Sequence, residues 1–388
     1  MKRVTLIVLD SLGIGALPDA EKYGDAGAHT LDHIADAMPD FKIPNLVKLG
    51  LGRIEGVTKI AKERDPSGAY GRLSEMSTGK DTITGHWEIA GLYTEVPFKT
   101  FPEFPKEFME AYEKAIGMGT LGNYAASGTE IIESLGPEHE KTGKPIIYTS
   151  ADSVFQIAAN TGVIPLEKLY HICEIAREML VGDVQVGRVI ARPYIMENGK
   201  RTRTSDRKDY AVSPSRKTVL DHIKESGKTV YAVGKINDIF NGHGVNISVH
   251  TESNMDGVDK TIEAMRTDFE GFLFTNLVDF DSKYGHRRDA AGYGKALEDF
   301  DGRLPEIMSA MKAEDILILC ADHGNDPAHS GWDHTREHVP VILYGKGIKP
   351  NVNLETRRSF ADISATIAEY LDVPKSQIGE SFLNQILK

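Results

Sequence analysis

The chain has 388 residues, enough for two domains, and 40% of them are hydrophobic, enough for a substantial core. Its 45 basic and 57 acidic residues give a formal net charge of −12, which argues against the broad basic surface of a nucleic-acid-binding protein. An anionic substrate is not excluded, because a local group of arginines, lysines or metal ions can bind an anion within an acidic chain.

The N-terminal sequence MKRVTLIVLD is interpreted as a strand, because its apolar run is only about five residues long and ends at Asp10, which is too short for a signal peptide. No stretch approaches the roughly 20 apolar residues of a membrane span. The cysteines, Cys173 and Cys320, lie far apart and form no CxxC motif, which fits a reducing compartment. We therefore expect a cytoplasmic protein with neither a membrane nor a nucleic-acid partner.

Short apolar runs that end in a polar residue or a glycine turn predict strands that are buried on both faces. In chain order these runs occupy residues 5–9, 229–233, 272–278, 316–320 and 339–344. Helical patterns occupy residues 219–225, 295–311 and 360–371. The alternation of strands and helices predicts an α/β core in which a mostly parallel sheet is flanked by helices.

The middle of the chain follows a different pattern. Residues 96–105, with the sequence VPFKTFPEFP, indicate a linker, and Ser213 with Pro214 marks a second boundary. We interpret residues 97–214 as a smaller α+β domain inserted into a core that comprises residues 1–96 and 215–388.

Polar residues follow several of the predicted strands. Asp10, Lys235, the Asp279 and Asp281 pair, and the Asp322-His323 dipeptide all stand at such strand ends. Ligands of α/β proteins gather beyond the carboxyl ends of the strands, so we expect these distant residues to share one site.

The C-terminal half adds histidines to these carboxylates. The segments DFDSKYGHRRD, LCADHGND and DHTREHVP contain the candidate metal ligands Asp279, Asp281, His286, Asp322, His323, His334 and His338. Carboxylate oxygens and neutral imidazoles are natural ligands of Mn²⁺ or Zn²⁺. A single aspartate at a strand end is more often a helix cap or a turn residue, so it is the joint occurrence of four clusters that favours a metal centre.

A candidate nucleophile lies in the segment MSTGKDTITGHWE, where Thr82 stands at the predicted start of a helix. A helix N-terminus offers unpaired N–H groups and a positive dipole to a phosphate, and a metal-bound hydroxyl there would be activated as a nucleophile. The alternative is that Asp81 or Thr82 only caps the helix, and that alternative would be preferred without the metal clusters.

Taken together, these residues resemble the alkaline phosphatase superfamily and, more closely, the bacterial phosphopentomutases, also called phosphodeoxyribomutases. The matching segments run in order from residue 6 to residue 345 and are LIVLDSLGIG, GKDTITGHWE, SADSVFQIA, GRVIARPY, VGKINDIF, NLVDFDSKYGHRRD, ADHGNDP and DHTREHVPVILYG. The strand-aspartate and DHG elements alone would indicate only the superfamily. The resemblance implies an alkaline-phosphatase-like core with an inserted α+β cap.

The resemblance also implies an activity. Phosphopentomutases interconvert α-D-ribose 1-phosphate and D-ribose 5-phosphate, and the 2-deoxyribose pair, in nucleotide salvage and pentose phosphate metabolism. They use two Mn²⁺ ions, a phosphothreonine and a sugar bisphosphate intermediate. A sugar bisphosphate such as glucose 1,6-bisphosphate is implied as the activator, and the chain is expected to be a monomer or a weak homo-oligomer.

Carried over by position, the resemblance divides the ligands into two sets. One metal would be held by Asp10, Thr82, Asp322 and His323, and the other by Asp281, His286 and His334. Asp281 is chosen over Asp279 because the family's ligand lies five residues before the histidine of the GH pair. His334 is chosen over His338 because it begins the H-[ST]-R-E stretch.

The inserted domain would be the family's cap and would supply substrate contacts. We expect Ser150 and Asp152 to bind ribose hydroxyls, and Arg188, Arg192 and Arg203 to bind the distal phosphate, because a guanidinium binds phosphate bidentately. Lys235 of the core would act there as a point charge. Three further arginines are interpreted as solvated surface charges, namely Arg201, Arg207 and Arg216.

Three other functions remain to be weighed. The first is a phosphatase or phosphodiesterase of the same superfamily, and the second is a 2,3-bisphosphoglycerate-independent phosphoglycerate mutase, whose nucleophile is a serine and whose chain is longer. The third is a non-catalytic sensor, which would need a broken ligand set or a missing nucleophile, and neither is seen in this sequence.

Overall fold

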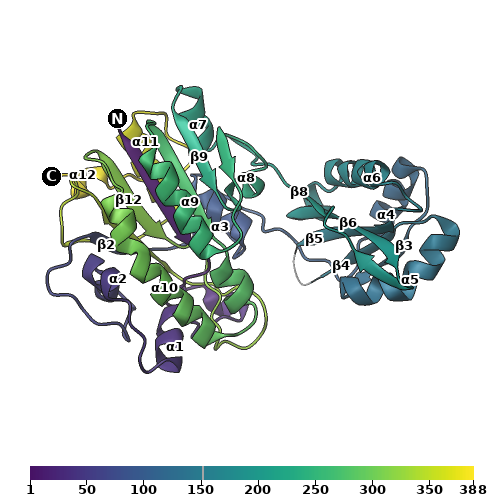
Figure 1. The fold of residues 1–388 in the computed structure, drawn as a ribbon, viewed down its shortest axis with the longest axis horizontal. Coiled ribbons are helices and arrows are strands. Elements are labelled where there is room, and N and C mark those ends of the chain that lie inside the picture. Colours follow the sequence, from purple (N-terminus) through teal and green to yellow (C-terminus); the bar gives the residue numbers. More distant parts are fainter. Residues whose placement is uncertain (151–152) are drawn as a thin grey trace. The chain divides into compact units, whose positions relative to one another are not determined.

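The computed structural model describes residues 1–150 and 153–388. The chain divides into two compact units, the first comprising Met1–Pro97 and Pro214–Lys388 and the second comprising Phe98–Ser213. The second unit is therefore inserted into the first along the sequence (Figure 1). Every helix in the described part of the chain is too short or too polar to span a membrane.

The first unit is built on a mostly parallel sheet with the strand order β10-β9-β11-β1-β12-β13-β2-β14. The first five of these strands run parallel to one another, β13 is antiparallel to both of its neighbours, and β14 is parallel to β2. The strands are β1 (Arg3–Leu9), β2 (Ala69–Leu73), β9 (Thr229–Val233), β10 (Ile247–Val249), β11 (Gly271–Leu277), β12 (Asp315–Cys320), β13 (Val339–Tyr344) and β14 (Val352–Arg357).

Helices form two packed groups around this sheet, one containing α1, α2, α9 and α10 and the other containing α3, α7, α8, α11 and α12. Their bounds are α1 (Thr30–Ala37), α2 (Pro44–Leu49), α3 (Thr82–Ile89), α7 (Val219–Glu225), α8 (Ile236–Ile239), α9 (Asn254–Arg266), α10 (Ala290–Ser309), α11 (Asp362–Leu371) and α12 (Leu383–Ile386). Short 3-10 helices at Ala20–Tyr23 and Leu51–Arg53 and a π-helical turn at Phe280–Gly285 complete the unit.

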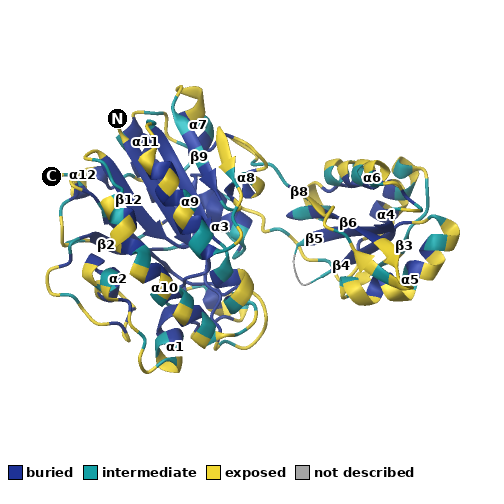
Figure 2. Cartoon of the chain, in the orientation of Figure 1, coloured by how far each residue is buried: buried dark blue, intermediate teal, exposed yellow. Residues whose placement is uncertain are grey.

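The central strands explain why the apolar runs could be recognised in the sequence. Every residue of β1, β11 and β12 is buried (Figure 2), which is the environment of a parallel strand covered on both faces. All five predicted runs correspond to strands, although the run 272–278 extends one residue past the end of β11, and the three predicted helices correspond to α7, α10 and α11. The α/β class predicted from the sequence is confirmed.

The order of the central strands positions the candidate site. β1 lies between β11 and β12, and Val8 is in register with Asn276 on one side and Cys320 on the other. The carboxyl ends of the three strands are therefore level, so the residues that follow them meet at one edge of the sheet.

The second unit is an α+β domain with the strand order β3-β4-β5-β6-β7, and β8 also pairs with β6. The neighbours β3 and β4, and β5 and β6, are parallel, whereas the remaining pairs are antiparallel. The elements are β3 (Leu121–Ala125), β4 (Ile146–Thr149), β5 (Val154–Asn160), β6 (Arg188–Glu197), β7 (Lys200–Arg203), β8 (Lys208–Ala211), α4 (Lys106–Ile116), α5 (Gly128–Thr142), α6 (Leu166–Met179) and a 3-10 helix at Gly182–Val184.

Both faces of this second sheet carry a hydrophobic cluster. Phe155 and Ile157 of β5 pack with side chains of α4 and α6, whereas Ala158 packs with Ile131 and Ile132 of α5. Alternate residues of a strand point to opposite faces, so α5 covers one face and α4 with α6 cover the other. The inserted unit thus has a core of its own.

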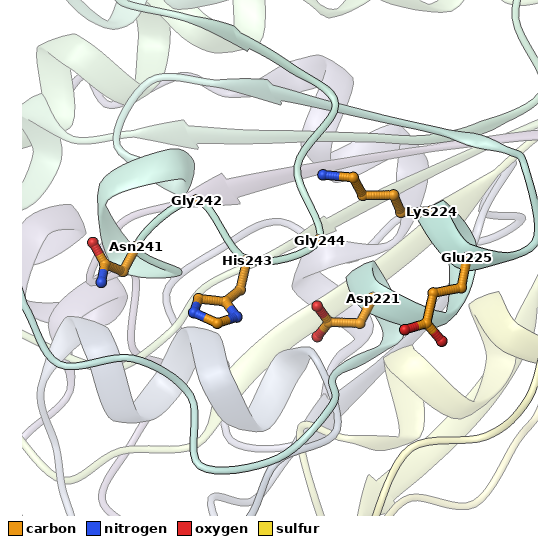
Figure 3. A pocket seen from close by; sticks show the side chains of 7 residues that line it. All are labelled: Asp221, Lys224, Glu225, Asn241, Gly242, His243 and Gly244. Atoms are coloured by element: carbon orange, nitrogen blue, oxygen red, sulfur yellow. The ribbon is translucent and has the colours of Figure 1, made fainter.

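A pocket of about 450 Å³ opens in the first unit between α7 and residues 241–244 (Figure 3). Its charged groups serve local structure, because Lys224 Nζ donates to the carbonyl of Val245 and Asp221 Oδ2 accepts from both the backbone N–H and the hydroxyl of Thr218. Its lining residues differ from the candidate site residues described next.

Candidate metal centre and nucleophile

Asp10, Asp322 and His323 form the first cluster of candidate ligands. Asp10 follows β1, and the other two follow the adjacent parallel strand β12. The three side chains are buried, and their nearest ligand atoms all lie within 4.8 Å of one another. His323 Nε2 lies 3.5 Å from Asp10 Oδ1 and 3.3 Å from Asp322 Oδ2.

Thr82 joins this first cluster from the N-terminus of α3. Its Oγ1 lies 3.2 Å from His323 Nε2. Asp81 is the residue that caps the helix, because its Oδ1 accepts from the N–H groups of Ile83 and Thr84. The Thr82 hydroxyl is therefore not needed as a cap and faces the ligand cluster.

Close packing of α3 against the ligand turn depends on a glycine. A Cβ on Gly85 would lie 2.0 Å from the carbonyl oxygen of Asp322 and 3.1 Å from its Cβ. Only the absence of a side chain lets the helix approach this turn, and the approach brings Thr82 to His323.

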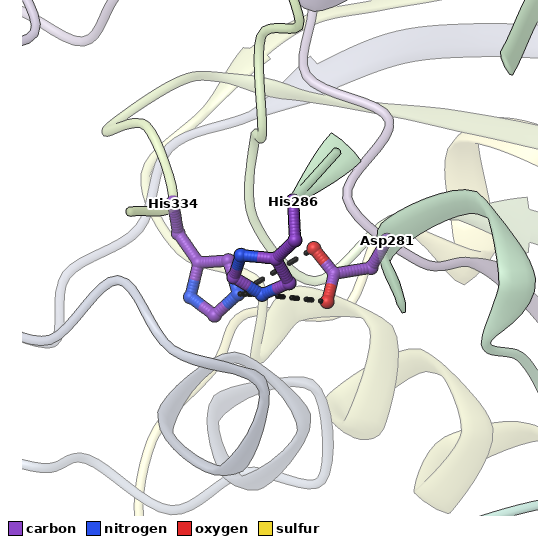
Figure 4. A group of neighbouring side chains, drawn as sticks. All are labelled: Asp281, His286 and His334. Carbon is purple, nitrogen blue, oxygen red and sulfur yellow. Dashed lines mark hydrogen bonds and ion pairs between the residues drawn. The ribbon is translucent and has the colours of Figure 1, made fainter. Parts of the chain in front are cut away.

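Asp281, His286 and His334 form the second cluster (Figure 4). Asp281 belongs to the π-helical turn Phe280–Gly285 after β11, and His286 follows that turn. Asp281 Oδ2 lies 3.2 Å from His286 Nε2, and Asp281 Oδ1 lies 3.4 Å from His334 Nε2. The two Nε2 atoms are 3.0 Å apart. The clusters adjoin, since the ring centroids of His323 and His334 are 4.0 Å apart.

The two residues that the resemblance set aside lie outside these clusters. Asp279 Oδ2 accepts from the backbone N–H of Asn254 and lies 3.1 Å from Lys283 Nζ, so it organises the local loop. His338 Nδ1 pairs with the hydroxyl of Ser74 at 3.2 Å.

The chemistry of both clusters fits a divalent cation. Asp10 Oδ1 is buried and receives no hydrogen bond from the described residues. Asp322 Oδ2 is also buried, and ring nitrogens of His86 and His323 approach it at 3.0 and 3.3 Å. Burial, with the neighbouring charges of Asp322 and Asp281, raises the pKa of Asp10 well above its ordinary value. Converging carboxylates of this kind are stabilised by a positive charge, which a metal ion bound by carboxylate and imidazole groups supplies.

The imidazole of His323 can supply part of that positive charge. Burial lowers the pKa of His323, but the charges of Asp322, Asp10 and Asp281 outweigh burial and raise it to about 9. Burial raises the pKa of Asp281, and the opposing attraction of His334 with hydrogen bonds from His286 and His334 brings it well below its ordinary value. The second cluster therefore holds its carboxylate in the ionised form that a metal ligand needs.

Sequence reasoning missed several residues that support these clusters. Asn276 Nδ2 donates to Asp10 Oδ2 over 2.8 Å, and it also contacts His86 Nε2, a buried ring whose Nδ1 lies 3.0 Å from Asp322 Oδ2. Asn325 Nδ2 donates to Asp281 Oδ1 over 2.7 Å. Asn276 stands beside a strand end and Asn325 within the DHGND segment, which are the signals that could have identified them.

Arg336 was missed as well, and it holds the loop that precedes Thr82. Its Nη1 donates to the carbonyls of Ser77 and Gly79 over 2.7 and 2.8 Å and to Glu75 Oε2 over 2.7 Å. This arginine follows His334 by two residues, so one short segment contributes to a candidate metal cluster and also supports the loop that precedes Thr82.

The expected substrate residues of the inserted unit are only partly described. Asp152 lies outside the described residues, and Ser150 follows β4. Arg188 and Arg192 stand four residues apart on β6, so they share one face of that strand. Arg188 Nη1 lies 3.5 Å from Asp209 Oδ2, and Arg192 Nε donates to Gln156 Oε1 over 3.2 Å.

Several positive groups meet near the N-terminus of α5. A Cβ on Gly128 would lie 2.1 Å from Arg203 Nη2 and 2.5 Å from the hydroxyl of Tyr148, so both groups border this helix end. Burial lowers the pKa of Arg192, and the charges of Arg207 and Arg203 add to that shift. The Tyr148 hydroxyl is buried and finds no hydrogen-bond partner among the described residues.

The other predicted charges have diverse surroundings. Lys235 is exposed at the start of α8. The interpretation of Arg201 as a solvated charge is wrong, because its side chain is only 12% exposed and pairs with Glu133 and Glu140. Arg207 binds Asp209 with two hydrogen bonds, each 2.6 Å long.

Comparisons with known proteins identify the family of the chain. Residues 2–375 match the family model of the Metalloenzyme superfamily. The chain is 57% identical over 388 residues to a phosphopentomutase of Acetivibrio thermocellus, covering 100% of both chains. It is also 57% identical over 387 residues to a phosphopentomutase of Caldanaerobacter subterraneus subsp. tengcongensis, covering 100% of this chain and 98% of that protein.

One solved structure extends the comparison to the fold. The PH0037 protein from Pyrococcus horikoshii superposes with a TM-score of 0.52 at 14% sequence identity, covering 98% of this chain and 99% of that one. This likeness concerns the architecture, which the two chains share over nearly their whole lengths.

Proposed function

This chain belongs to the phosphopentomutase family of the metalloenzyme superfamily and is an isomerase that transfers a phosphoryl group within a pentose phosphate, and we propose that Thr82 carries this group as a phosphothreonine. The substrates are α-D-ribose 1-phosphate and D-ribose 5-phosphate, with the 2-deoxyribose pair as further substrates. The proposal rests above all on the 3.2 Å approach of Thr82 Oγ1 to His323 Nε2.

Asp10, Thr82, Asp322 and His323 would hold one divalent cation, and Asp281, His286 and His334 would hold a second. Mn²⁺ is the proposed ion, and other divalent metals suit the same ligands. Bound there, the cations would neutralise charge on the transferring phosphoryl oxygens and favour the ionised hydroxyl of Thr82.

The residues then act in a defined order. Thr82 Oγ1 first accepts a phosphoryl group from an activating sugar bisphosphate such as glucose 1,6-bisphosphate. In turnover the bond between phosphorus and Thr82 Oγ1 breaks, and a bond forms to the free hydroxyl oxygen of the pentose monophosphate, whose proton is taken up by the departing Thr82 oxygen. The resulting pentose 1,5-bisphosphate returns its other phosphoryl group to Thr82. The positive end of the α3 dipole would favour the negative charge of the phosphothreonine.

The inserted unit would hold the distal phosphate. Arg192 and Arg203, with Arg188 on the same strand face as Arg192, provide guanidinium groups for this purpose. The unpaired hydroxyl of Tyr148 adds a donor beside the N-terminus of α5. Ser150 and Asp152 remain the proposed ligands of the ribose hydroxyls, and Lys235 remains a proposed charge contact.

Labelling of the protein tests the nucleophile. Incubation with ³²P-labelled glucose 1,6-bisphosphate should transfer label to the wild-type protein. Thr82→Ala should take up no label, and its turnover rate should fall at least about 10⁴-fold. Thr82→Ser keeps a hydroxyl and serves as the matched control, which should still accept label. Label that persists in Thr82→Ala would overturn the assignment.

The products separate a mutase from a hydrolase. With ribose 5-phosphate as substrate, ribose 1-phosphate should form while free phosphate stays near the background. Release of phosphate at the rate of substrate loss would instead identify a phosphatase.

A further inference from the structure

Residues 325–334, hereafter the 325–334 segment, contact two candidate ligands of the second cluster and contain the third. Asn325 Nδ2 donates to Asp281 Oδ1 over 2.7 Å. His286 Nδ1 donates to the backbone carbonyl of Trp332 over 3.1 Å, which leaves its Nε2 lone pair to face the cluster (Figure 4). His334 is itself a candidate ligand at the end of the segment. The geometry of the second cluster therefore depends on where this segment lies.

Arg288 fixes the position of the segment at both ends. Its guanidinium donates to Asn325 Oδ1 and the carbonyl of Asp326 at one end, and to the carbonyls of Gly331 and Asp333 at the other. A further bond to the carbonyl of Gly285 ties the same guanidinium to the turn that contains Asp281. These acceptors are all neutral oxygens, so the contact depends on the planar fork of the guanidinium more than on its charge.

The backbone of Arg288 is also unusual. Its φ is +55°, a left-handed value that costs free energy in a residue with a side chain. The network of carbonyl contacts holds the residue in this conformation.

We propose that Arg288 is a positioning residue that sets the metal affinity of the second cluster by holding the 325–334 segment. This inference rests on the proposed function, in which Asp281, His286 and His334 bind a divalent cation. Arg288 acts through Asn325, whose Oδ1 it holds so that Nδ2 points at Asp281, and through the Trp332 carbonyl next to the Gly331 and Asp333 anchors. Partners of this kind orient metal ligands, and their loss lowers metal affinity about 10- to 100-fold.

Metal binding at isolated clusters tests the proposal. Asp10→Ala removes a ligand of the first cluster and keeps the second intact, whereas Asp281→Ala removes a ligand of the second cluster and keeps the first intact. In the Asp10→Ala background, adding Arg288→Ala should weaken Mn²⁺ binding, measured by equilibrium dialysis, about 10- to 100-fold. In the Asp281→Ala background, adding Arg288→Ala should leave Mn²⁺ binding unchanged. Arg288→Lys should weaken binding similarly, because one ammonium cannot reach acceptors at both ends of the segment.

Two control variants match these substitutions. Arg287→Ala removes the same charge one residue away, from an exposed position, and should leave Mn²⁺ binding unchanged. Trp332→Phe alters a side chain that is 71% exposed but keeps the backbone carbonyl, and it should also have no effect. A loss of affinity in Arg287→Ala equal to that in Arg288→Ala would overturn the proposal.

A milder variant covers the case in which Arg288→Ala does not fold. Asn325→Ala should lower Mn²⁺ affinity at the second cluster, and in the double variant the two effects should be less than additive, because Arg288 acts partly through Asn325. If Asn325→Ala binds Mn²⁺ like the wild type, or if the two effects add fully, the proposed route is wrong.

The outcomes separate this inference from the proposed function. If adding Asp281→Ala to the Asp10→Ala background leaves Mn²⁺ binding unchanged, the metal assignment of the second cluster fails. If Asp281→Ala abolishes that binding but Arg288→Ala does not weaken it, only the role of Arg288 fails.

Discussion

Two adjacent residues at the start of α3 have different roles, one as the helix cap and the other facing the candidate metal ligands. Asp81 satisfies the backbone N–H groups of Ile83 and Thr84, while the hydroxyl of Thr82 faces His323. A threonine that also capped the helix would have its oxygen occupied by a backbone N–H. Because the neighbouring aspartate caps the helix, the threonine oxygen remains available for the proposed phosphoryl transfer.

At the same scale, Arg192 offers a direct test of the phosphate contacts. Its guanidinium is half-buried beside Arg203 and Arg207, a surrounding that favours an anion. Arg192→Ala should raise KM for ribose 5-phosphate about 10- to 100-fold, since hydrogen bonds to charged groups contribute about 1.5–3 kcal/mol, with no change in bound Mn²⁺. Steady-state kinetics and metal analysis measure both effects. Arg216→Ala, which removes an exposed charge, is the control, and an equal rise in KM there would contradict the prediction.

Some residues of the candidate site can be identified from the sequence and others cannot. Asp10 and Asp322 could be identified because each ends a recognisable apolar run. For Asn276 and Asn325 the sequence offers only their positions, at a strand end and within the DHGND segment. The carboxylates that they contact are 266 and 44 residues away in the sequence, so their partners could not be predicted. Arg288 gave no signal either, because its acceptors are backbone carbonyls and a neutral amide oxygen.

Among the elements, strands proved easier to locate than to orient. The run that became β13 was recognised as buried, yet its antiparallel direction could not be read from its residues, because central strands of both kinds are apolar. β2 was missed because it is short and contains Gly71, whose added Cβ would lie 2.9 Å from the carbonyl oxygen of Glu355 in β14. The glycine that weakened the strand pattern is the one that lets β14 pack close.

Helix α5 depends on a neutral histidine. His139 Nδ1 donates to the carbonyl of Lys144 over 2.7 Å, and His139 Nε2 accepts from the backbone N–H of Asn160 over 2.9 Å. A protonated ring could not accept that second bond. Burial accordingly lowers the pKa of His139, against smaller opposing effects of Lys144 and Glu140.

The stability of the inserted unit should therefore depend on pH. The unfolded chain binds a proton at His139 as pH falls below about 6.5, whereas the folded unit resists it until a lower pH. The stabilisation is thus complete above that value and is lost as pH falls through the folded pKa. Urea unfolding of the whole protein, followed by hydrogen exchange in β5 and α5, should show this loss between pH 7.5 and 5. In His139→Asn, which cannot titrate, that part of the pH dependence should vanish, and an unchanged profile would contradict the prediction.

On the scale of the whole molecule, the two units should respond differently to metal. The candidate ligands all belong to the first unit, and the second has its own hydrophobic clusters. A ligand that binds only the folded state at 100 times its Kd adds about 2.7 kcal/mol of stability. A chelator should therefore lower the melting temperature of the first unit by several degrees and leave the second unchanged. Calorimetry with unit-resolved hydrogen exchange measures this, and equal shifts in both units would contradict it.

The strand order of the central sheet also affects the order in which the two units can fold. β1 is made first, but its partners β11 and β12 begin at Gly271 and Asp315, so Asp10 has no neighbouring strand until most of the chain has left the ribosome. The inserted unit, by contrast, is one continuous stretch, Phe98–Ser213, whose pairings are all internal. Chains are made at about 5–20 residues per second and contacts distant in sequence form slowly. During synthesis the inserted unit can therefore complete its fold before the segment that ends in His334, and with it the candidate metal centre, has been made.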